Sequence, residues 1–167
     1  KNIEQAKKIF SIGLEKVIIN SEAHNNKNLI GEIAKIYGTQ AVVGVIDVKK
    51  NFWGKNEVVS KSASQKHKQS PVEWAKELES QGVGEIMITS VDREGTWSGL
   101  DIELIKSITD AVNVPVIAHG GAGNVNHVNE AVKVAKASAV CMGSMVVYQK
   151  KDFGVLINFP DKKLLEA

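Results

Sequence analysis

One carboxylate stands out in an otherwise apolar stretch, residues 41–48 (AVVGVIDV), where Asp47 is the next-to-last residue. An ionised carboxylate is costly in apolar surroundings unless water or a partner group solvates it. At the end of a buried strand, Asp47 is therefore placed to act as a general acid or base. The alternative is a structural acid that caps the following loop or pairs with Lys49.

Two glycine-rich turns are suited to binding phosphate. Gly120 and Gly121 lie in the sequence HGGAGN, between an apolar run and a helical pattern, and Gly143-Ser144 follows the next apolar run. Glycines let the backbone approach an anion closely, and the free N–H groups of a helix N-terminus favour negative charge. Two such turns after consecutive strands are typical of the phosphate site of barrel enzymes. Tight turns without a ligand are the alternative.

The stretch 84–101 (GEIMITSVDREGTWSGLD) combines a short apolar strand, a charged loop closed by glycines, and a helix that starts at Asp101. Acids, hydroxyls and glycines after a strand are typical of the catalytic face of a βα protein. The alternative is an ordinary connection between a strand and a helix.

Other polar side chains are expected at the ends of strands. Asn20-Ser21 and Thr89-Ser90 follow apolar runs, where they either contact a ligand or cap the next helix. His119, between a strand and the glycines, has a titrating role or a structural one.

The alternation of side chains along a strand predicts one ion pair. Residues two apart share a face, so Lys16 lies on the same face as Asn20, and Glu85 on the same face as Thr89. If Asn20 and Thr89 face the mouth of a barrel, Lys16 and Glu85 point inward at its floor and should pair. The alternative is that both charges lie in solvent.

These residues are set in a regular alternation of helices and strands. Five buried strands without two-residue periodicity predict a parallel sheet covered by helices, as part of a barrel or an open sheet. Because five strands cannot close an eight-stranded barrel, we expect either a longer chain or a partner. The expected strands are 16–20, 41–48, 85–90, 115–118 and 139–142, with a small hairpin around 58–59. The first expected helix starts at residue 3 and is ended by Gly13. The other expected helices are 28–37, 71–78 (capped by Ser70), 101–112, 125–135 and a short one from 161.

Composition fits one ordinary globular domain of 167 residues. A net charge of +2 argues against binding to nucleic acid or a membrane surface, and a single cysteine, Cys141, suits the reducing cytoplasm. No signal peptide is expected from this sequence, and none of its apolar runs approaches the roughly 20 residues that span a bilayer. His24, His67 and His127 lack the spacing of a metal site, so neither a metal nor another cofactor is expected.

Taken together, these motifs resemble the cyclase subunit of imidazole glycerol phosphate synthase. The resemblance runs over nearly the whole chain and implies a (β/α)8 barrel that uses ammonia from a glutaminase subunit to cleave and cyclise a phosphorylated ribulosyl intermediate of histidine biosynthesis. The motifs that carry it are KVIINSEA at 16–23, VVGVIDVKK at 42–50, GEIMITSVDREGT at 84–96 and HGGAGN at 119–124.

The resemblance also implies residue roles. Asp47 matches a catalytic Asp, Lys16 and Glu85 match a charged ring that gates ammonia, and Asn20 and Ser21 match one phosphate site. A second phosphate site is matched by Gly95, Gly121, Gly143 and Ser144. Thr89, Glu94 and Gly120 complete the predicted substrate-binding set. Residues 1–167 are then the C-terminal part of one barrel domain, roughly strands 4 to 8, and are expected to be inactive alone.

Three departures leave the substrate open. Glu94 stands where the family usually has Asp, His119 where it usually has Ser, and the tail 146–160 (VVYQKKDFGVLINFP) resembles a paralogous branch. That branch serves the ammonia-dependent amidation of bacterial surface-polysaccharide sugars. A non-catalytic scaffold that channels ammonia is a third possibility.

Overall fold

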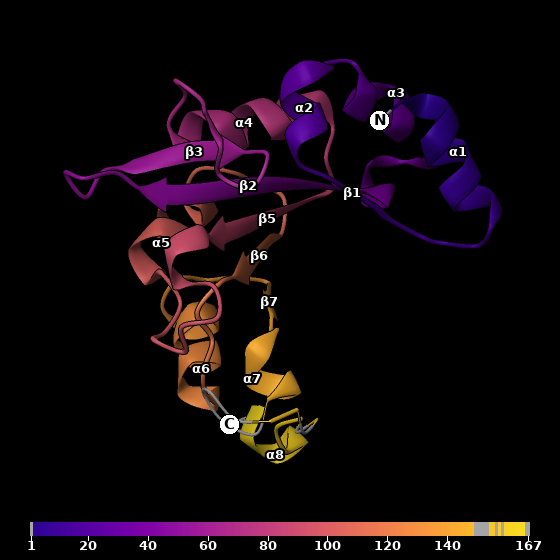
Figure 1. Ribbon diagram of the computed structural model, residues 1–167. Coiled ribbons are helices and arrows are strands. Elements are labelled where there is room, and N and C mark those ends of the chain that lie inside the picture. The colour runs from indigo at the N-terminus through magenta and orange to yellow at the C-terminus, as the bar shows by residue number, and fades with distance from the viewer. Residues whose placement is uncertain (1, 149–153, 156, 158, 166–167) are drawn as a thin grey trace.

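The computed structural model describes residues 2–148, 154, 155, 157 and 159–165 as a curved sheet flanked by helices (Figure 1). The strands are β1 Val17–Ile19, β2 Val42–Lys50, β3 Asn56–Ser60, β4 Gln65–Lys66, β5 Glu85–Ser90, β6 Val116–His119 and β7 Ala139–Cys141. The helices are α1 Ile3–Ser11, α2 Ser21–Asn25, α3 Leu29–Tyr37, α4 Pro71–Gln81, α5 Ile102–Thr109, α6 Val125–Lys133, α7 Ser144–Val147 and α8 Lys162–Leu165, with short 3-10 turns η1 Thr39–Ala41 and η2 Val91–Arg93.

The five predicted strands are parallel and neighbour one another in chain order, β1-β2-β5-β6-β7. Helices connect them in sequence, and the fold is that of an incomplete (β/α)8 barrel, as predicted. The predicted hairpin is also confirmed. It is formed by β3 and β4, and β3 pairs antiparallel with the second half of β2, from Asp47 opposite Val59 to Lys50 opposite Asn56.

The core lies between the sheet and its helices. On β2, Val42, Ile46 and Val48 point toward the helices and are 0%, 0% and 2% exposed. They pack with buried side chains of α3, α4 and α5, and each such side chain contributes roughly 1.5–3 kcal/mol by leaving water. This packing fixes which side chains of the strands point to the other, concave face.

The expectation of five fully buried strands is wrong for the two outer ones. Ile18 in β1 is 62% exposed, and Ala139 in β7 is exposed as well. Both strands lie at the ends of the arc, so their inward side chains have a neighbouring strand on one side only. The two-residue alternation of burial in β1 (buried, exposed, buried) follows from this position.

Local signals explain where α4 begins and ends. Ser70 and Glu73 form a reciprocal capping box, and Pro71 occupies the first helical position. The helix ends at Gln81, three residues beyond the predicted end. The next residue, Gly82, stops it by adopting a left-handed conformation (φ +99°).

Helix ends elsewhere differ more from the predictions. The helices predicted over 101–112 and 125–135 end earlier, at Thr109 and Lys133. The short helices α2 and α7 were missed, because five and four residues are too few to show helical periodicity. Much of the tail 146–160 lies outside the described residues. The short helix predicted from residue 161 begins at Lys162.

Candidate functional site

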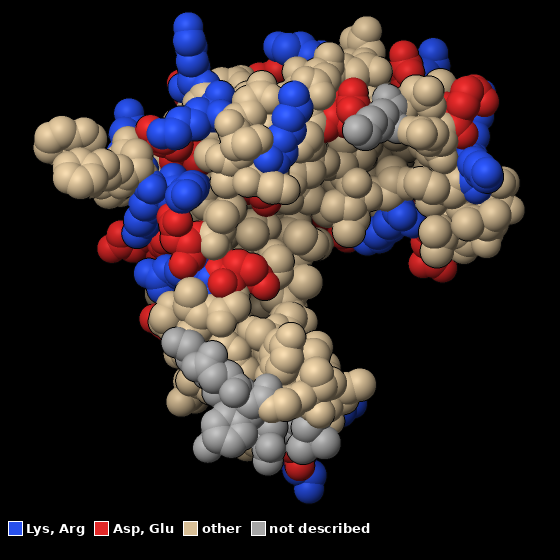
Figure 2. Space-filling view, viewed as in Figure 1, with Lys and Arg blue, Asp and Glu red and all other residues tan. Residues whose placement is uncertain are grey.

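The candidate site lies at the carboxyl ends of the central strands. Asp47 in β2 is in register with Thr89 in β5, Thr89 with His119 in β6, and His119 with Cys141 in β7. In a parallel sheet, residues in register point to the same face, and here that face is the concave one. Acidic and basic side chains gather around the ends of β2 and β5 (Figure 2).

Asn20 orients the carboxylate of Asp47. The Asn20 side-chain N–H₂ donates a hydrogen bond of 2.8 Å to Oδ2 of Asp47, and Asn20 itself is the N-cap residue of α2. The carbonyl oxygen of the same amide is buried and has no hydrogen-bond partner among the described residues. Because buried acceptors are nearly always satisfied, this oxygen is available to a donor on a ligand beside Asp47.

His119 lies between a hydroxyl and a carboxylate. Its Nδ1 is 3.2 Å from Oγ1 of Thr89, and its Nε2 is 3.2 Å from Oε2 of Glu94. The other Glu94 oxygen lies 3.5 Å from the position that a Cβ on Gly143 would occupy. The structure thus brings together three predicted site residues, Thr89, Glu94 and Gly143, with His119 at their centre.

Cys141 borders this group. Burial, and secondarily the charge of Glu94, raise the pKa of the Cys141 thiol above its usual range. The thiol is therefore neutral at physiological pH and adds no charge to the site.

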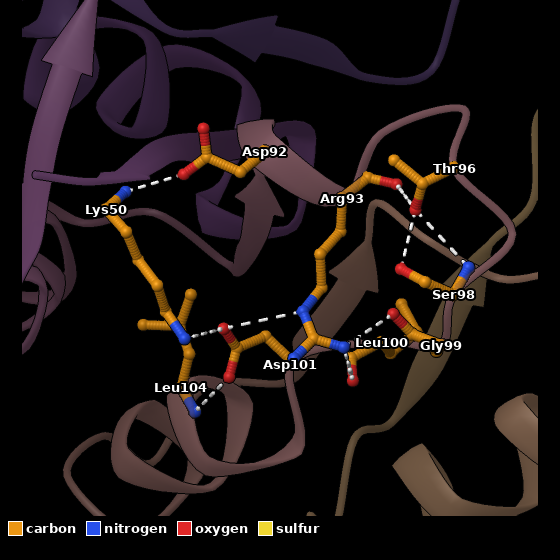
Figure 3. A network of polar contacts seen from close by, with 9 residues as sticks. All are labelled: Lys50, Asp92, Arg93, Thr96, Ser98, Gly99, Leu100, Asp101 and Leu104. Carbon is orange, nitrogen blue, oxygen red and sulfur yellow. Dashed lines mark hydrogen bonds and ion pairs between the residues drawn. The ribbon is translucent and has the colours of Figure 1, made fainter. Parts of the chain in front are cut away.

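A polar network around the buried Asp101 holds the loop that carries Glu94 and Gly95 (Figure 3). Asp101 is 5% exposed and accepts a hydrogen bond from the N–H of Leu104, as its predicted place at a helix start requires. Its second oxygen lies 3.4 Å from Nζ of Lys50 and 3.8 Å from Nε of Arg93. Two cations thus compensate a carboxylate that would otherwise be costly to bury.

Arg93 extends this network along the loop. Its guanidinium donates hydrogen bonds to the backbone carbonyls of Gly99 and Leu100, while Asp92 accepts the backbone N–H of Lys50. Sequence reasoning missed the roles of Lys50, Asp92 and Arg93, because charged loop residues give no sign of which partner they find. The charged run from Asp92 to Glu94 was the available signal.

The glycine turns have a structural reason to be glycine. Gly120 and Gly121 have φ values of +95° and +105°, and a Cβ would lie 2.5 Å from the Ser90 carbonyl oxygen and 2.3 Å from that of Gly99, respectively. Gly143 has an ordinary φ of −105° and is the N-cap of α7, with Ser144 as its first residue. Gly95 has no atom within 4 Å of a Cβ position.

Lys16 and Glu85 form the predicted ion pair. Their Nζ and Oε1 atoms are 2.5 Å apart, although β2 lies between their strands. Both residues lie at the amino ends of the strands, whereas Asp47 and Thr89 lie at the carboxyl ends. The ion pair and the candidate catalytic group therefore occupy opposite ends of the concave face.

Ser21, predicted to bind phosphate with Asn20, has a different contact. Its hydroxyl oxygen accepts a hydrogen bond of 3.0 Å from the backbone N–H of Lys61. The contact ties the start of α2 to the turn between β3 and β4.

No cluster of three or more His, Cys, Asp or Glu side chains suited to a metal ion occurs within the described part of the chain. His24 and His67 instead stack with ring centroids 3.6 Å apart, and burial, then the charge of His67, lower the pKa of His24 to about 4. None of the described helices has the length and apolar character needed to cross a membrane.

Comparison with known proteins identifies relatives along the whole chain. A family model described as "Histidine biosynthesis protein" matches residues 1–152. The chain is 45% identical over 167 residues to a Pseudomonas aeruginosa protein named "Putative imidazole glycerol phosphate synthase subunit hisF2", covering 100% of this chain and 66% of that protein.

Several relatives carry the name "Imidazole glycerol phosphate synthase subunit HisF". The protein from Thermococcus onnurineus is 42% identical over 152 residues, or 90% of this chain and 59% of its own length. The protein from Alkaliphilus metalliredigens is 40% identical over 150 residues, or 90% of this chain and 60% of its own length. The chain thus spans 59–66% of the length of these relatives.

Proposed function

Because this chain belongs to the histidine biosynthesis protein family, we propose that it is the C-terminal part, roughly strands 4 to 8, of a cytoplasmic ammonia-dependent cyclase. In this proposal, the whole protein cleaves and cyclises a phosphorylated ribulosyl intermediate to give imidazole glycerol phosphate, with ammonia from a glutaminase subunit. The observation that carries the proposal is the oriented carboxylate of Asp47, held by Asn20 at the end of β2.

Asp47 is the proposed general acid/base. Its carboxylate lies on the concave face at a strand end, where substrate and water have access, and the hydrogen bond from Asn20 fixes one oxygen while the other stays open to a substrate. The unpaired carbonyl oxygen of Asn20 adds an acceptor beside it. An N–H group of ammonia or of the substrate suits this pair of acceptors.

Ammonia is proposed to arrive from the other end of the barrel. The Lys16–Glu85 pair lies at the amino ends of the strands, at the end of the concave face opposite Asp47. A mutually neutralised pair at this point supports a gate through which a small neutral molecule passes. The glutaminase subunit is accordingly proposed to dock at the amino ends of the strands.

Phosphate groups of the substrate are proposed to bind at the turns beyond the other strand ends. Gly95, Gly121, Gly143 and Ser144 would offer backbone N–H groups to one phosphate, and the start of α2 at Asn20-Ser21 would offer N–H groups to the other. The open surroundings of Gly95 and the position of Ser144 as the first residue of α7 support the first of these sites.

A second candidate function is ammonia-dependent amidation of a bacterial surface-polysaccharide sugar. Two observations favour it: the relative that is 45% identical is named as a hisF2 subunit, and Glu94 and His119 form an ion pair where the family usually has Asp and Ser. Both candidates use the same ammonia route and differ in the molecule that receives the ammonia.

The test is an assay on the full-length protein from which this chain derives. Supplied with ammonium ions and the ribulosyl intermediate, it is expected to release imidazole glycerol phosphate, detected by chromatography and mass spectrometry. Turnover with ammonia but without the glutaminase would establish the chemistry of this subunit. Absence of imidazole product at saturating ammonia would contradict the cyclase and favour the sugar pathway.

The phosphate site has its own test in Ser144→Glu. An acid in the first turn suits a helix N-terminus, so the fold is expected to tolerate it, but its charge repels phosphate. We expect the affinity for inorganic phosphate, measured by calorimetry on the full-length protein, to fall about tenfold or more, or about 1.4 kcal/mol. Ser144→Gln, of the same size without the charge, should stay within about threefold. Equal phosphate affinities in the two variants would show that phosphate does not bind at this turn.

A further inference from the structure

We propose that His119 is a second proton-transfer group of this site, held by Thr89 and Glu94 and acting on the same substrate as Asp47. The inference rests on the proposed ammonia-dependent function and adds to it a catalytic residue where the family usually has Ser.

The contacts of His119 allow it to gain or lose a proton without moving. In the neutral ring with a proton on Nε2, that N–H donates to Glu94 and Nδ1 accepts from the Thr89 hydroxyl. In the imidazolium, both nitrogens donate, and the hydroxyl turns to offer a lone pair instead. A hydroxyl on one side and a carboxylate on the other thus satisfy both protonation states.

The position of the pair argues for more than a structural contact. The side chains of His119 and Glu94 are 23% and 44% exposed, and a contact this open contributes little to stability. His119 lies in the row that Asp47 begins and Thr89 continues, and Glu94 reaches it from the loop after η2. The exposed carboxylate of Glu94 can swing aside and release Nε2 to a substrate.

The spacing leaves room for a reacting group between the two proposed catalytic residues. His119 and Asp47 are two strands apart, or about 10 Å along the sheet, with only the small Thr89 between them. Side chains that reach in from both positions can contact one substrate held over Thr89.

The titratable groups around His119 come from three elements. They are Glu94 from the loop after η2, Asp47 from β2 beyond Thr89, and the neutral thiol of Cys141 from β7. The nearby cation, Arg93, is directed to Asp101 and the backbone carbonyls of its own loop.

The chemistry needs two groups with opposite tasks. Condensation of ammonia with the ketose carbonyl of a ribulosyl substrate forms a C=N bond and releases the carbonyl oxygen as water. The nitrogen loses two protons and the oxygen gains two. In each of the two stages, addition of ammonia and loss of water, Asp47 takes one proton from nitrogen and the imidazolium of His119 gives one proton to oxygen. After each stage Asp47 releases its proton to solvent and His119 takes one up, so no other reactant is required.

The test compares His119→Gln, Glu94→Gln and the control Glu103→Gln in the full-length protein, with kcat followed against pH. Glutamine at 119 keeps hydrogen-bonding groups without titrating, so we expect kcat to fall about 10²-fold and the decline of kcat at alkaline pH to disappear. Glu94→Gln removes the carboxylate beside Nε2 of His119, so the pH profile of kcat should differ from that of the wild type. Glu103 is exposed on α5, and its variant should match the wild type.

A readout without turnover completes the test. In NMR spectra, the His119 ring signals should differ between Glu94→Gln and the wild type because the carboxylate beside Nε2 is lost, and thermal unfolding should show that each variant is folded. Folded His119→Gln with kcat within twofold of wild type and an unchanged pH profile would overturn the role of His119 alone. A wild-type protein without ammonia-dependent turnover would overturn the proposed function together with this inference.

Discussion

Asp47→Asn is expected to lower ammonia-dependent turnover of the full-length protein by roughly 10²–10⁴. Asparagine has nearly the same shape as aspartate, and its side-chain oxygen can still accept the hydrogen bond from Asn20 that holds Asp47 at 2.8 Å. What it lacks is the ability to take up and release a proton. The measurement is kcat with saturating ammonia, which bypasses any effect on the glutaminase.

The matched control for this prediction is Asp110→Asn. Asp110 is an exposed carboxylate at the end of α5 that pairs with Lys106, so its loss removes one charge without touching the site. Its variant should retain wild-type turnover. A folded Asp47→Asn protein with wild-type turnover would exclude Asp47 as the acid/base. His119 and Glu94 would then be the remaining candidates.

Gly121→Ala is expected to destabilise the full-length protein by about 2–5 kcal/mol. A residue with a side chain at positive φ costs about 1–2 kcal/mol, and crowding into a packed region costs a further 1–3 kcal/mol or so. At Gly121 the new Cβ would lie 2.3 Å from the Gly99 carbonyl oxygen. The Gly121 carbonyl also accepts the Gly99 N–H, so the two segments cannot separate freely.

Gly95→Ala provides the comparison, since Gly95 also has a positive φ, +72°, but no atom within 4 Å of a Cβ. Its variant should lose only the conformational part, about 1–2 kcal/mol. Urea unfolding of both variants measures the difference. Equal losses would show that the loop at Gly99 moves away without cost. If the prediction holds, weaker phosphate binding in a Gly121 variant could be a consequence of its lower stability. Ser144 is therefore the better position at which to test the phosphate site.

The sequence alone determined the order of elements and the place of the main candidate. Helix and strand patterns repeat over short windows, because backbone geometry sets periods of 3.6 and 2 residues. The parallel arrangement, the cap at Ser70 and the place of Asp47 toward the carboxyl end of β2 were therefore predictable. The Lys16–Glu85 pair was predictable for the same reason: two inward charges on one apolar face have few other partners.

Only the tertiary structure decided which loop side chains meet. His119 pairs with Glu94, and Asp101 is buried between Lys50 and Arg93. Both contacts depend on the path of the loops and on side-chain rotamers, neither of which leaves a periodic signal in the sequence. The exposure of Ile18 likewise reflects the place of β1 at the end of the arc rather than its composition. Contacts between residues distant in the chain are fixed by packing. The placement of His119 beside Glu94, in the same row as Asp47, is therefore visible only in the folded structure.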